Sequence, residues 1–177
     1  LERIMQPVAD AMVAEGCPFC GVLYGGLMKT ARGIEVIEFN ARFGDPETEV
    51  VLPRLKSDIV DIFRAVADGG DTTLEWHDFA TLGIVLASKG YPEAYEKGHE
   101  IKGLNAIEGA VYHMGTRADG DRVVTAGGRV LFVVGKGRDL AEARVNALAD
   151  VGRIDCDNLF HRTDIGHWAF GESKKEN

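Results

Sequence analysis

The sequence is short of cysteine, of positive charge and of long apolar runs, and each shortage argues against a class of protein. Three cysteines in 177 residues are too few for a disulfide framework, so we expect a reducing compartment, the cytoplasm. The 28 acidic side chains outnumber the 20 basic ones, and the resulting net charge of -8 argues against a nucleic-acid-binding surface. No apolar run approaches the ~18 residues that a membrane-spanning helix requires, so we expect no membrane insertion.

The sequence does contain enough apolar material for a buried core, since 45% of its residues are hydrophobic. A length of 177 residues allows one full domain or two small ones. The chain starts with Leu1 rather than Met and enters a helical pattern at once, so we expect a piece of a longer protein. Nothing in the sequence determines an oligomeric state.

The N-terminal part mixes helical and strand patterns. Apolar residues at helical spacing predict one helix over residues 1–15 and another over residues 49–67. Residues 21–28 and 34–40, joined by a glycine-containing turn, predict a β-hairpin. The Asp-Gly-Gly-Asp stretch at residues 68–71 ends the second helix and predicts a domain boundary.

The following region carries short apolar runs between glycines and predicts a compact, mostly antiparallel β unit. A helix is predicted after it, over residues 139–151, with Asp139 as the N-cap and Glu142 three positions later. Gly135 and Gly137 are expected to form a tight turn before this helix. The expected strands are residues 81–88, 110–114, 122–126 and 129–134.

These patterns predict an α+β fold in two domains, residues 1–70 and residues 71–170. The charged stretch at residues 171–177 is expected to be a disordered tail.

Polar side chains gather at the end of the second hairpin strand. Alternate side chains of a strand share a face, so Val36, Glu38 and Asn40 are expected on one face. Ile37 and Phe39 are expected on the other face, where they can meet a core. The Cα atoms of Glu38 and Asn40 would lie about 7 Å apart. A carboxylate and an amide oxygen at this spacing suit Mg²⁺, which usually takes one or two protein groups together with substrate phosphates.

The loop after this strand adds an arginine and two carboxylates. Arg42 can hold a phosphate or a carboxylate through two parallel hydrogen bonds. Asp45 and Glu47 can contribute acidic character or hold an amine. The alternative is a solvated turn in which Glu38 forms a salt bridge with Arg42 or Arg32, and the spacing alone leaves both interpretations open.

Cys17 and Cys20 form a Cys-x-x-Cys pair. A zinc site would need two further ligands, and Cys156 offers no second pair. A redox motif would follow a strand and open a helix, whereas here a helix precedes and a strand follows. We therefore expect neither function.

The segment "VIEFNARFGDPETEVVLPRL", residues 36–55, resembles the metal-binding segment of ATP-grasp ligases. The shorter word "EFNARFGDPE" is similar to the family of phosphoribosylamine–glycine ligases (GAR synthetases) of purine biosynthesis. The likeness covers nearly the whole chain. It includes "EGCPFCGVLYGGLMKT", "VVLPRLKSDIVDIF", "VLASKGYPEAYEKGHEIKGL", "VYHMGT", "TAGGRVLFVVGKG" and "RTDIG".

The resemblance implies an enzyme that joins glycine to 5-phosphoribosylamine. ATP phosphorylates the glycine carboxylate, and the amine then attacks the glycyl phosphate. Transfer of a phosphoryl group requires neutralisation of its charge, a task for a metal ion. By residue matching, Glu38 and Asn40 are implied as ligands of Mg²⁺ or Mn²⁺.

The resemblance also implies roles for the loop. Arg42 is implied to stabilise the transferred phosphoryl group or the acyl phosphate. Gly44, Asp45 and Glu47 are implied to receive the glycine ammonium, although Asp45 or Glu47 can equally cap the next helix.

The implied fold is the C-terminal half of an ATP-grasp domain, residues 1–70, followed by a small β-rich, barrel- or sandwich-like domain, residues 71–170. Because the ATP clamp of the family would lie upstream of Leu1, we expect the isolated chain to be inactive. Two alternatives stay open: a non-catalytic β-rich module of the same ancestry, and another ATP-grasp carboxylate–amine ligase.

Overall fold

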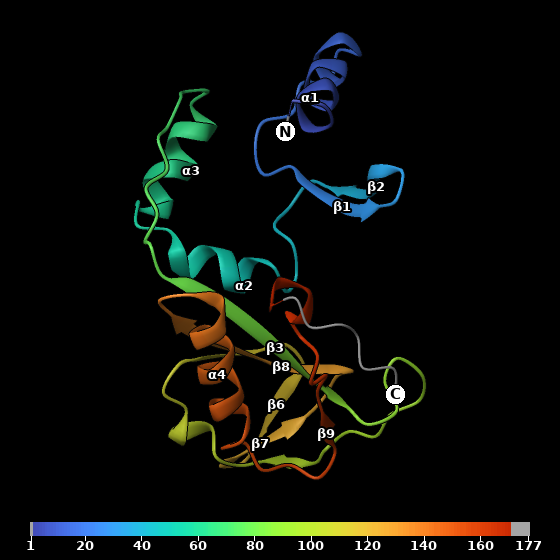
Figure 1. Ribbon diagram of the computed structural model, residues 1–177, viewed down its shortest axis with the longest axis vertical. Helices are drawn as coiled ribbons and strands as arrows, with labels where there is room; N and C mark the ends of the chain where they lie inside the picture. The colour runs from blue at the N-terminus through green and yellow to red at the C-terminus, as the bar shows by residue number, and fades with distance from the viewer. Residues whose placement is uncertain (1, 171–177) are drawn as a thin grey trace. The chain divides into compact units, whose positions relative to one another are not determined.

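Figure 1 shows the computed structural model of the chain, which describes residues 2–170. Leu1 and the tail predicted at residues 171–177 lie outside the described residues. The described residues form two compact units. The first unit contains the chain up to Thr48 together with Leu55–Trp76, and the second unit contains Glu49–Arg54 and the chain from His77 onward.

The first unit contains the predicted N-terminal helix and the predicted hairpin. Helix α1 spans Met5–Ala14, and strands β1 (Tyr24–Thr30) and β2 (Gly33–Asn40) pair antiparallel. At the turn, the Thr30 hydroxyl accepts a hydrogen bond from the Arg32 N–H at 3.1 Å. A threonine side chain that binds its own turn in this way favours a tight connection between the strands.

A β-bulge decides which residues share a face of the hairpin. Gly26 pairs with Glu38, but the next residue, Leu27, pairs with Val36, so Ile37 is the extra residue of the bulge. Cross-strand partners share a face, whereas the neighbours Gly26 and Leu27 lie on opposite faces. Val36 therefore lies on the face opposite to Glu38, and the prediction that these two residues share a face is wrong.

The apolar side chains that were expected to face a core are exposed. The exposed fraction is 63% for Ile37 and 39% for Phe39. Gly25 is the cross-strand partner of Phe39, so both lie on the same face of the hairpin. Met5 of α1 packs against this face, and a Cβ at Gly25 would lie only 2.7 Å from the Met5 sulfur. Because α1 itself contains no buried residue, this contact covers only part of the face, and the expected burial is not reached.

The helix predicted over residues 49–67 is broken. A short helix, α2 (Thr48–Val51), is followed by a 3₁₀ turn, η1 (Leu52–Arg54), and then by helix α3 (Ile59–Ala67). Pro53 contributes to the break because it has no N–H to donate to the carbonyl four residues earlier. The prediction of one continuous helix is therefore wrong between η1 and α3.

Extended pairing and a helix cap occupy the residues between η1 and α3. Leu55 forms an isolated antiparallel bridge with Trp76, and the Lys56 N–H donates to the Glu75 carbonyl at 2.8 Å. The Asp58 carboxylate then accepts two backbone N–H groups in the first turn of α3. This is the N-cap interaction that starts a new helix.

The second unit is built on two antiparallel sheets, which confirms the predicted α+β class. The sheets have the strand orders β5-β8-β3-β9 and β4-β7-β6. Within residues 2–170 the end strands of one sheet do not pair with those of the other, so the barrel form of the prediction is wrong. The bounds are Ala80–Ser88 (β3), Glu100–Ile101 (β4), Ala110–His113 (β5), Thr116–Asp119 (β6), Arg122–Thr125 (β7), Arg129–Gly137 (β8) and Leu159–Phe160 (β9), with 3₁₀ turns η2 (Leu104–Ala106) and η3 (His167–Phe170).

Helix α4 (Leu140–Val151) packs against β8 and β3, as Figure 1 shows. The Asp139 carboxylate accepts the Glu142 N–H at 2.9 Å, which confirms the predicted N-cap. The Glu142 carboxylate in turn accepts the Arg138 N–H at 2.6 Å. These two bonds provide acceptors for backbone N–H groups at the start of the helix, which would otherwise lack partners.

The predicted tight turn at Gly135 and Gly137 is wrong, because both residues belong to β8. A Cβ would lie 2.3 Å from the Ala143 carbonyl oxygen if placed at Gly135, and 2.4 Å from the Ala143 nitrogen if placed at Gly137. Glycine therefore lets α4 approach the strand. The buried cluster beneath α4 contains Leu82, Ile84, Leu86, Ile101, Val130, Leu131, Val133, Ala143, Ala147 and Val151. Among the described helices, none is long and apolar enough to cross a membrane.

Candidate functional site

Glu38 and Asn40 lie together on one face of the hairpin, as predicted. Their cross-strand partners are Gly26 and Tyr24, with no bulge between these two pairs. The Asn40 side-chain N–H donates to Glu38 Oε1 at 2.9 Å. This bond leaves Oδ1 of Asn40 and Oε2 of Glu38 as the oxygens that a cation can take.

The donor set fits a cation that needs few protein ligands. Within residues 2–170, no group of three or more His, Cys, Asp or Glu side chains is arranged to hold a metal ion. Glu38 and Asn40 supply a carboxylate and an amide oxygen, the hard ligands that Mg²⁺ prefers. Waters and substrate phosphates usually complete such a site.

Tyr24 belongs to the same cluster, although it was not predicted from the sequence. It lies directly across from Asn40 in the hairpin. Its hydroxyl donates a hydrogen bond to Glu47 Oε1 at 3.1 Å. Tyr24 therefore connects the face that carries Glu38 and Asn40 with the loop that carries Glu47.

The backbone at Gly44 fits against Tyr24 and Glu47. Gly44 is buried, and a Cβ at this position would lie 2.5 Å from Glu47 Oε2 and 3.1 Å from Tyr24 Cε2. The Thr48 hydroxyl donates to the Gly44 carbonyl at 2.5 Å, and the Thr48 N–H donates to the same oxygen at 3.2 Å. The structure thus brings the backbone of Gly44 and the carboxylate of Glu47 together.

Arg42 and Asp45 are exposed. Arg42 Nη1 donates to the neighbouring Phe43 carbonyl at 2.8 Å. The salt bridges considered for Glu38 are not found among the described residues, and Arg32 pairs instead with Glu35 at 2.8 Å. The salt bridge of the alternative interpretation is therefore wrong, whereas the exposure of Arg42, Asp45 and Glu47 agrees with its solvated turn.

The electrostatics around Tyr24 keep its phenol protonated. Partial burial raises the pKa of Tyr24, and the hydrogen bond to Glu47 raises it further. The negative charges of Glu47 and Glu38 act in the same direction, whereas the charge of Arg42 opposes them. Since the unperturbed value is already about 10, the hydroxyl stays a hydrogen-bond donor at neutral pH.

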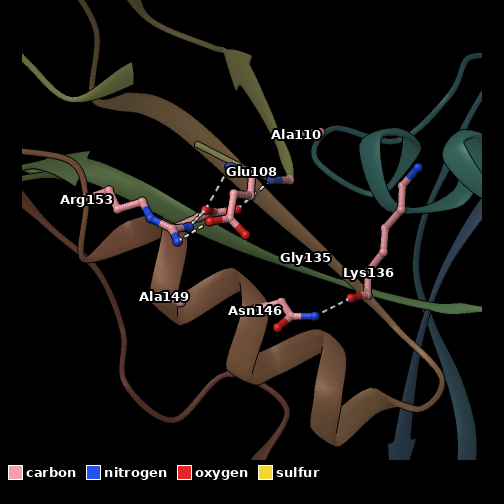
Figure 2. A pocket seen from close by; sticks show the side chains of 9 residues that line it. Glu108, Ala110, Gly135, Lys136, Asn146, Ala149 and Arg153 are labelled. Carbon is pink, nitrogen blue, oxygen red and sulfur yellow. Dashed lines mark hydrogen bonds and ion pairs between the residues drawn. The ribbon is translucent and has the colours of Figure 1, made fainter. Parts of the chain in front are cut away.

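The second unit contains a pocket of about 510 Å³ beside α4 (Figure 2). Here the buried Asp150 carboxylate accepts the N–H groups of Glu108 (3.0 Å) and Gly109 (2.8 Å). Arg153 binds Asp150 and also Glu108, the latter at 2.6 Å. Glu108, Asp150 and Arg153 are paired with one another, and Figure 2 shows the bonds between Arg153 and Glu108, so we interpret these three charged groups as structural. The Lys136 ammonium lies instead over the Phe79 ring, 5.0 Å from its centroid.

Burial by itself raises the pKa of Asp150, because it disfavours the charged form. The two backbone N–H groups and Arg153 outweigh this effect and hold the pKa below its ordinary value. Asp150 is therefore ionised at neutral pH, and its charge is satisfied within the second unit.

Comparisons with known proteins agree with the resemblance. Residues 1–48 match the family model "Phosphoribosylglycinamide synthetase, ATP-grasp (A) domain". Residues 81–168 match "Phosphoribosylglycinamide synthetase, C domain", and the two matches together cover more than half of the chain. The chain belongs to the phosphoribosylglycinamide synthetase family. The predicted family resemblance is confirmed.

Two similar proteins carry the name phosphoribosylamine–glycine ligase. The protein of Halalkalibacterium halodurans is 49% identical over 97% of this chain and 41% of its own length. That of Streptomyces coelicolor is 48% identical over 97% of this chain and 43% of its own length. The chain thus spans less than half the length of these two relatives.

A solved structure supports the same family. The crystal structure of phosphoribosylamine–glycine ligase from Thermotoga maritima matches with a TM-score of 0.72 and 34% sequence identity. The match covers 81% of this chain and 36% of that chain.

Proposed function

We propose that the chain is the C-terminal part of an ATP-dependent ligase that joins glycine to 5-phosphoribosylamine in purine biosynthesis in the cytoplasm. The observation that carries the proposal is the Glu38–Asn40 pair on one face of a hairpin, inside the segment that matches the ATP-grasp domain. In the proposed reaction the γ-phosphoryl group of ATP passes to the glycine carboxylate. The amine of phosphoribosylamine then attacks the acyl carbon, and phosphate leaves.

In this proposal Glu38 and Asn40 hold Mg²⁺ or Mn²⁺ through Oε2 and Oδ1. A divalent cation bound there would neutralise charge on the transferring phosphates. The hydrogen bond between the two side chains orients both oxygens before substrate arrives, which lowers the cost of ordering the site.

The loop after β2 would bind the reacting groups. Arg42 is exposed and carries a fixed positive charge, suited to the transferred phosphoryl group or to the acyl phosphate. Glu47, with Asp45 and the Gly44 backbone, would receive the glycine ammonium. The Glu47 carboxylate is held by Tyr24, so its negative charge has a defined place.

We assign residues 1–70 to the C-terminal half of the ATP-grasp domain and residues 71–170 to a sandwich-like C-terminal domain. Both sheets of the second unit contribute side chains to one apolar cluster, which supports the sandwich-like description. The rest of the ligase would supply the ATP clamp, and the isolated chain would then be inactive.

The proposal is tested in the complete protein that carries this chain, or in the Halalkalibacterium halodurans relative with its matched region replaced by this sequence. We call either of these the full-length ligase. With ATP, Mg²⁺, 5-phosphoribosylamine and glycine, it should form ADP, phosphate and phosphoribosylglycinamide in equal amounts. The isolated chain serves as the control and should form none.

Two results would contradict the proposal in different ways. Formation of ADP with another amino acid but not with glycine would identify an ATP-grasp ligase of another specificity. No ADP with any amino acid, from a folded protein, would identify a non-catalytic module.

A further inference from the structure

Three contacts of Tyr24 place it between two parts of the candidate site. Its backbone pairs with Asn40, so its side chain starts on the face that carries Glu38. Its hydroxyl lies 3.1 Å from Glu47 Oε1. Its ring edge lies 3.1 Å from the place that a Cβ at Gly44 would occupy.

These contacts restrict the Glu47 side chain, which is otherwise exposed. One carboxylate oxygen accepts a hydrogen bond from the Tyr24 hydroxyl. Within residues 2–170 this is the one side-chain hydrogen bond that the Glu47 carboxylate makes. The other oxygen lies directly over Gly44, at a distance that only a residue without a Cβ permits. An exposed glutamate usually samples several rotamers. The Tyr24 hydroxyl on one side and the Gly44 backbone on the other favour one rotamer of Glu47.

We propose that Tyr24 is a positioning residue, whose hydroxyl holds the Glu47 carboxylate beside the Glu38–Asn40 pair so that the carboxylate meets the glycine ammonium. This inference rests on the proposed function, because it takes glycine as the ligand of Glu47. Tyr24 touches no reacting atom in this account and acts only through Glu47. Its loss should therefore weaken glycine binding and leave ATP binding unchanged.

The charges around the hydroxyl support a donor role. The hydroxyl lies 3.1 Å from the Glu47 carboxylate, on the hairpin face that also carries the Glu38 carboxylate. A substrate ammonium would compensate this local negative charge. A neutral phenol can bind Glu47 without competing with the ammonium for charge, which a lysine at this position would do.

The test compares Tyr24→Phe with Tyr112→Phe in the full-length ligase. Tyr112 lies on β5 in the second unit and serves as the matched control. Tyr24→Phe should raise the KM for glycine about tenfold, the loss expected for one hydrogen bond to a charged acceptor, and change the KM for ATP less than about twofold. Tyr112→Phe should change neither constant.

Two further variants separate positioning from a general loss of structure. Gly44→Ala keeps the Tyr24 hydroxyl but places a Cβ 2.5 Å from Glu47 Oε2 and 3.1 Å from the Tyr24 ring edge, and it should raise the KM for glycine in the same selective way. Tyr24→Phe combined with Glu47→Gln should be no worse than Glu47→Gln alone, because the hydroxyl acts through that carboxylate. Melting temperatures of all variants are measured alongside.

Equal rises in both KM values, an unchanged KM for glycine in Tyr24→Phe, or additive effects in the double variant would each overturn the inference while the proposed function stands. If Tyr24→Phe does not fold, the Gly44→Ala variant decides. An unchanged KM for glycine in Gly44→Ala would then overturn the inference as well. A folded wild-type ligase that does not use glycine overturns both the proposed function and this role of Tyr24.

Discussion

In the second unit, the core residues Ile84, Val130 and Val133 are at most 1% exposed, whereas in the first unit Ile37 is 63% exposed and α1 contains no buried residue. Polar groups differ in the same way. The Asp150 carboxylate is buried and accepts backbone N–H groups and Arg153, whereas Glu38 and Asn40 bind each other and keep one oxygen each for a further partner.

The second unit thus contains residues that stabilise the fold, whereas the hairpin of the first unit contains residues that are available for chemistry. A buried charge whose bonds are all made contributes to stability, and its removal leaves donors without partners. An exposed carboxylate with an unused oxygen contributes little to stability and can bind a ligand. Substitutions in the second unit should therefore act on stability, and substitutions on the hairpin face should act on ligation.

The largest expected difference in stability is between two isoleucines. Ile84→Ala removes a fully buried side chain of β3 and should lower the local free energy of unfolding by about 3 kcal/mol. Ile37→Ala removes an exposed side chain of β2 and should change it by about 0.5 kcal/mol or less. Hydrogen exchange of the amides of β3, β8 and β2 measures both effects. Equal losses in protection would break the distinction between the units.

A smaller effect is expected at Asp150, and it depends on pH. Asp150→Asn removes a charge that two N–H groups and Arg153 bind, and at pH 7 it should lower the stability of the second unit by about 2 kcal/mol. Because the folded-state pKa of Asp150 is lowered, its contribution is complete above the unfolded value and is lost as pH falls through the folded value. The difference between wild type and variant should therefore shrink below about pH 4.

Asp164 provides the matched control for Asp150. Its hydrogen bond from Arg162 lowers its pKa to about 2, but the pair lies on the surface. Asp164→Asn should leave the hydrogen-exchange protection of β8 unchanged at every pH. A pH-dependent loss of protection as large as that of Asp150→Asn would show that burial is not what distinguishes the two carboxylates.

The sequence predicted those elements whose pattern is local. The hairpin, the strands near residues 81–88 and 110–114, and the Asp139 cap were all found because alternation and capping depend on neighbouring residues. The break before α3 was missed because, besides Pro53, it depends on pairing of Leu55 with Trp76, which are distant in the sequence. The role of Gly135 was missed because it depends on the approach of α4.

The candidate site was predicted in part for the same reason. Glu38 and Asn40 are two residues apart on one strand, so their shared face follows from alternation alone. Tyr24 lies on the other strand, and its place depends on register. Counting back from the turn pair Thr30–Gly33 without a bulge would set Tyr24 opposite Phe39, on the wrong face. The bulge at Ile37 shifts this pairing by one residue and brings Tyr24 opposite Asn40.

The central claim is that the Glu38–Asn40 pair binds the cation of the ligation reaction. The most direct measurement is the rate of phosphoribosylglycinamide formation by the full-length ligase carrying Glu38→Gln, with Glu35→Gln as the control. Glu35 lies on the same strand and forms a surface ion pair with Arg32. We predict that Glu38→Gln lowers kcat/KM about 10²-fold or more with little change in melting temperature, whereas Glu35→Gln keeps it within about twofold. A Glu38→Gln ligase that keeps the wild-type rate would contradict the account.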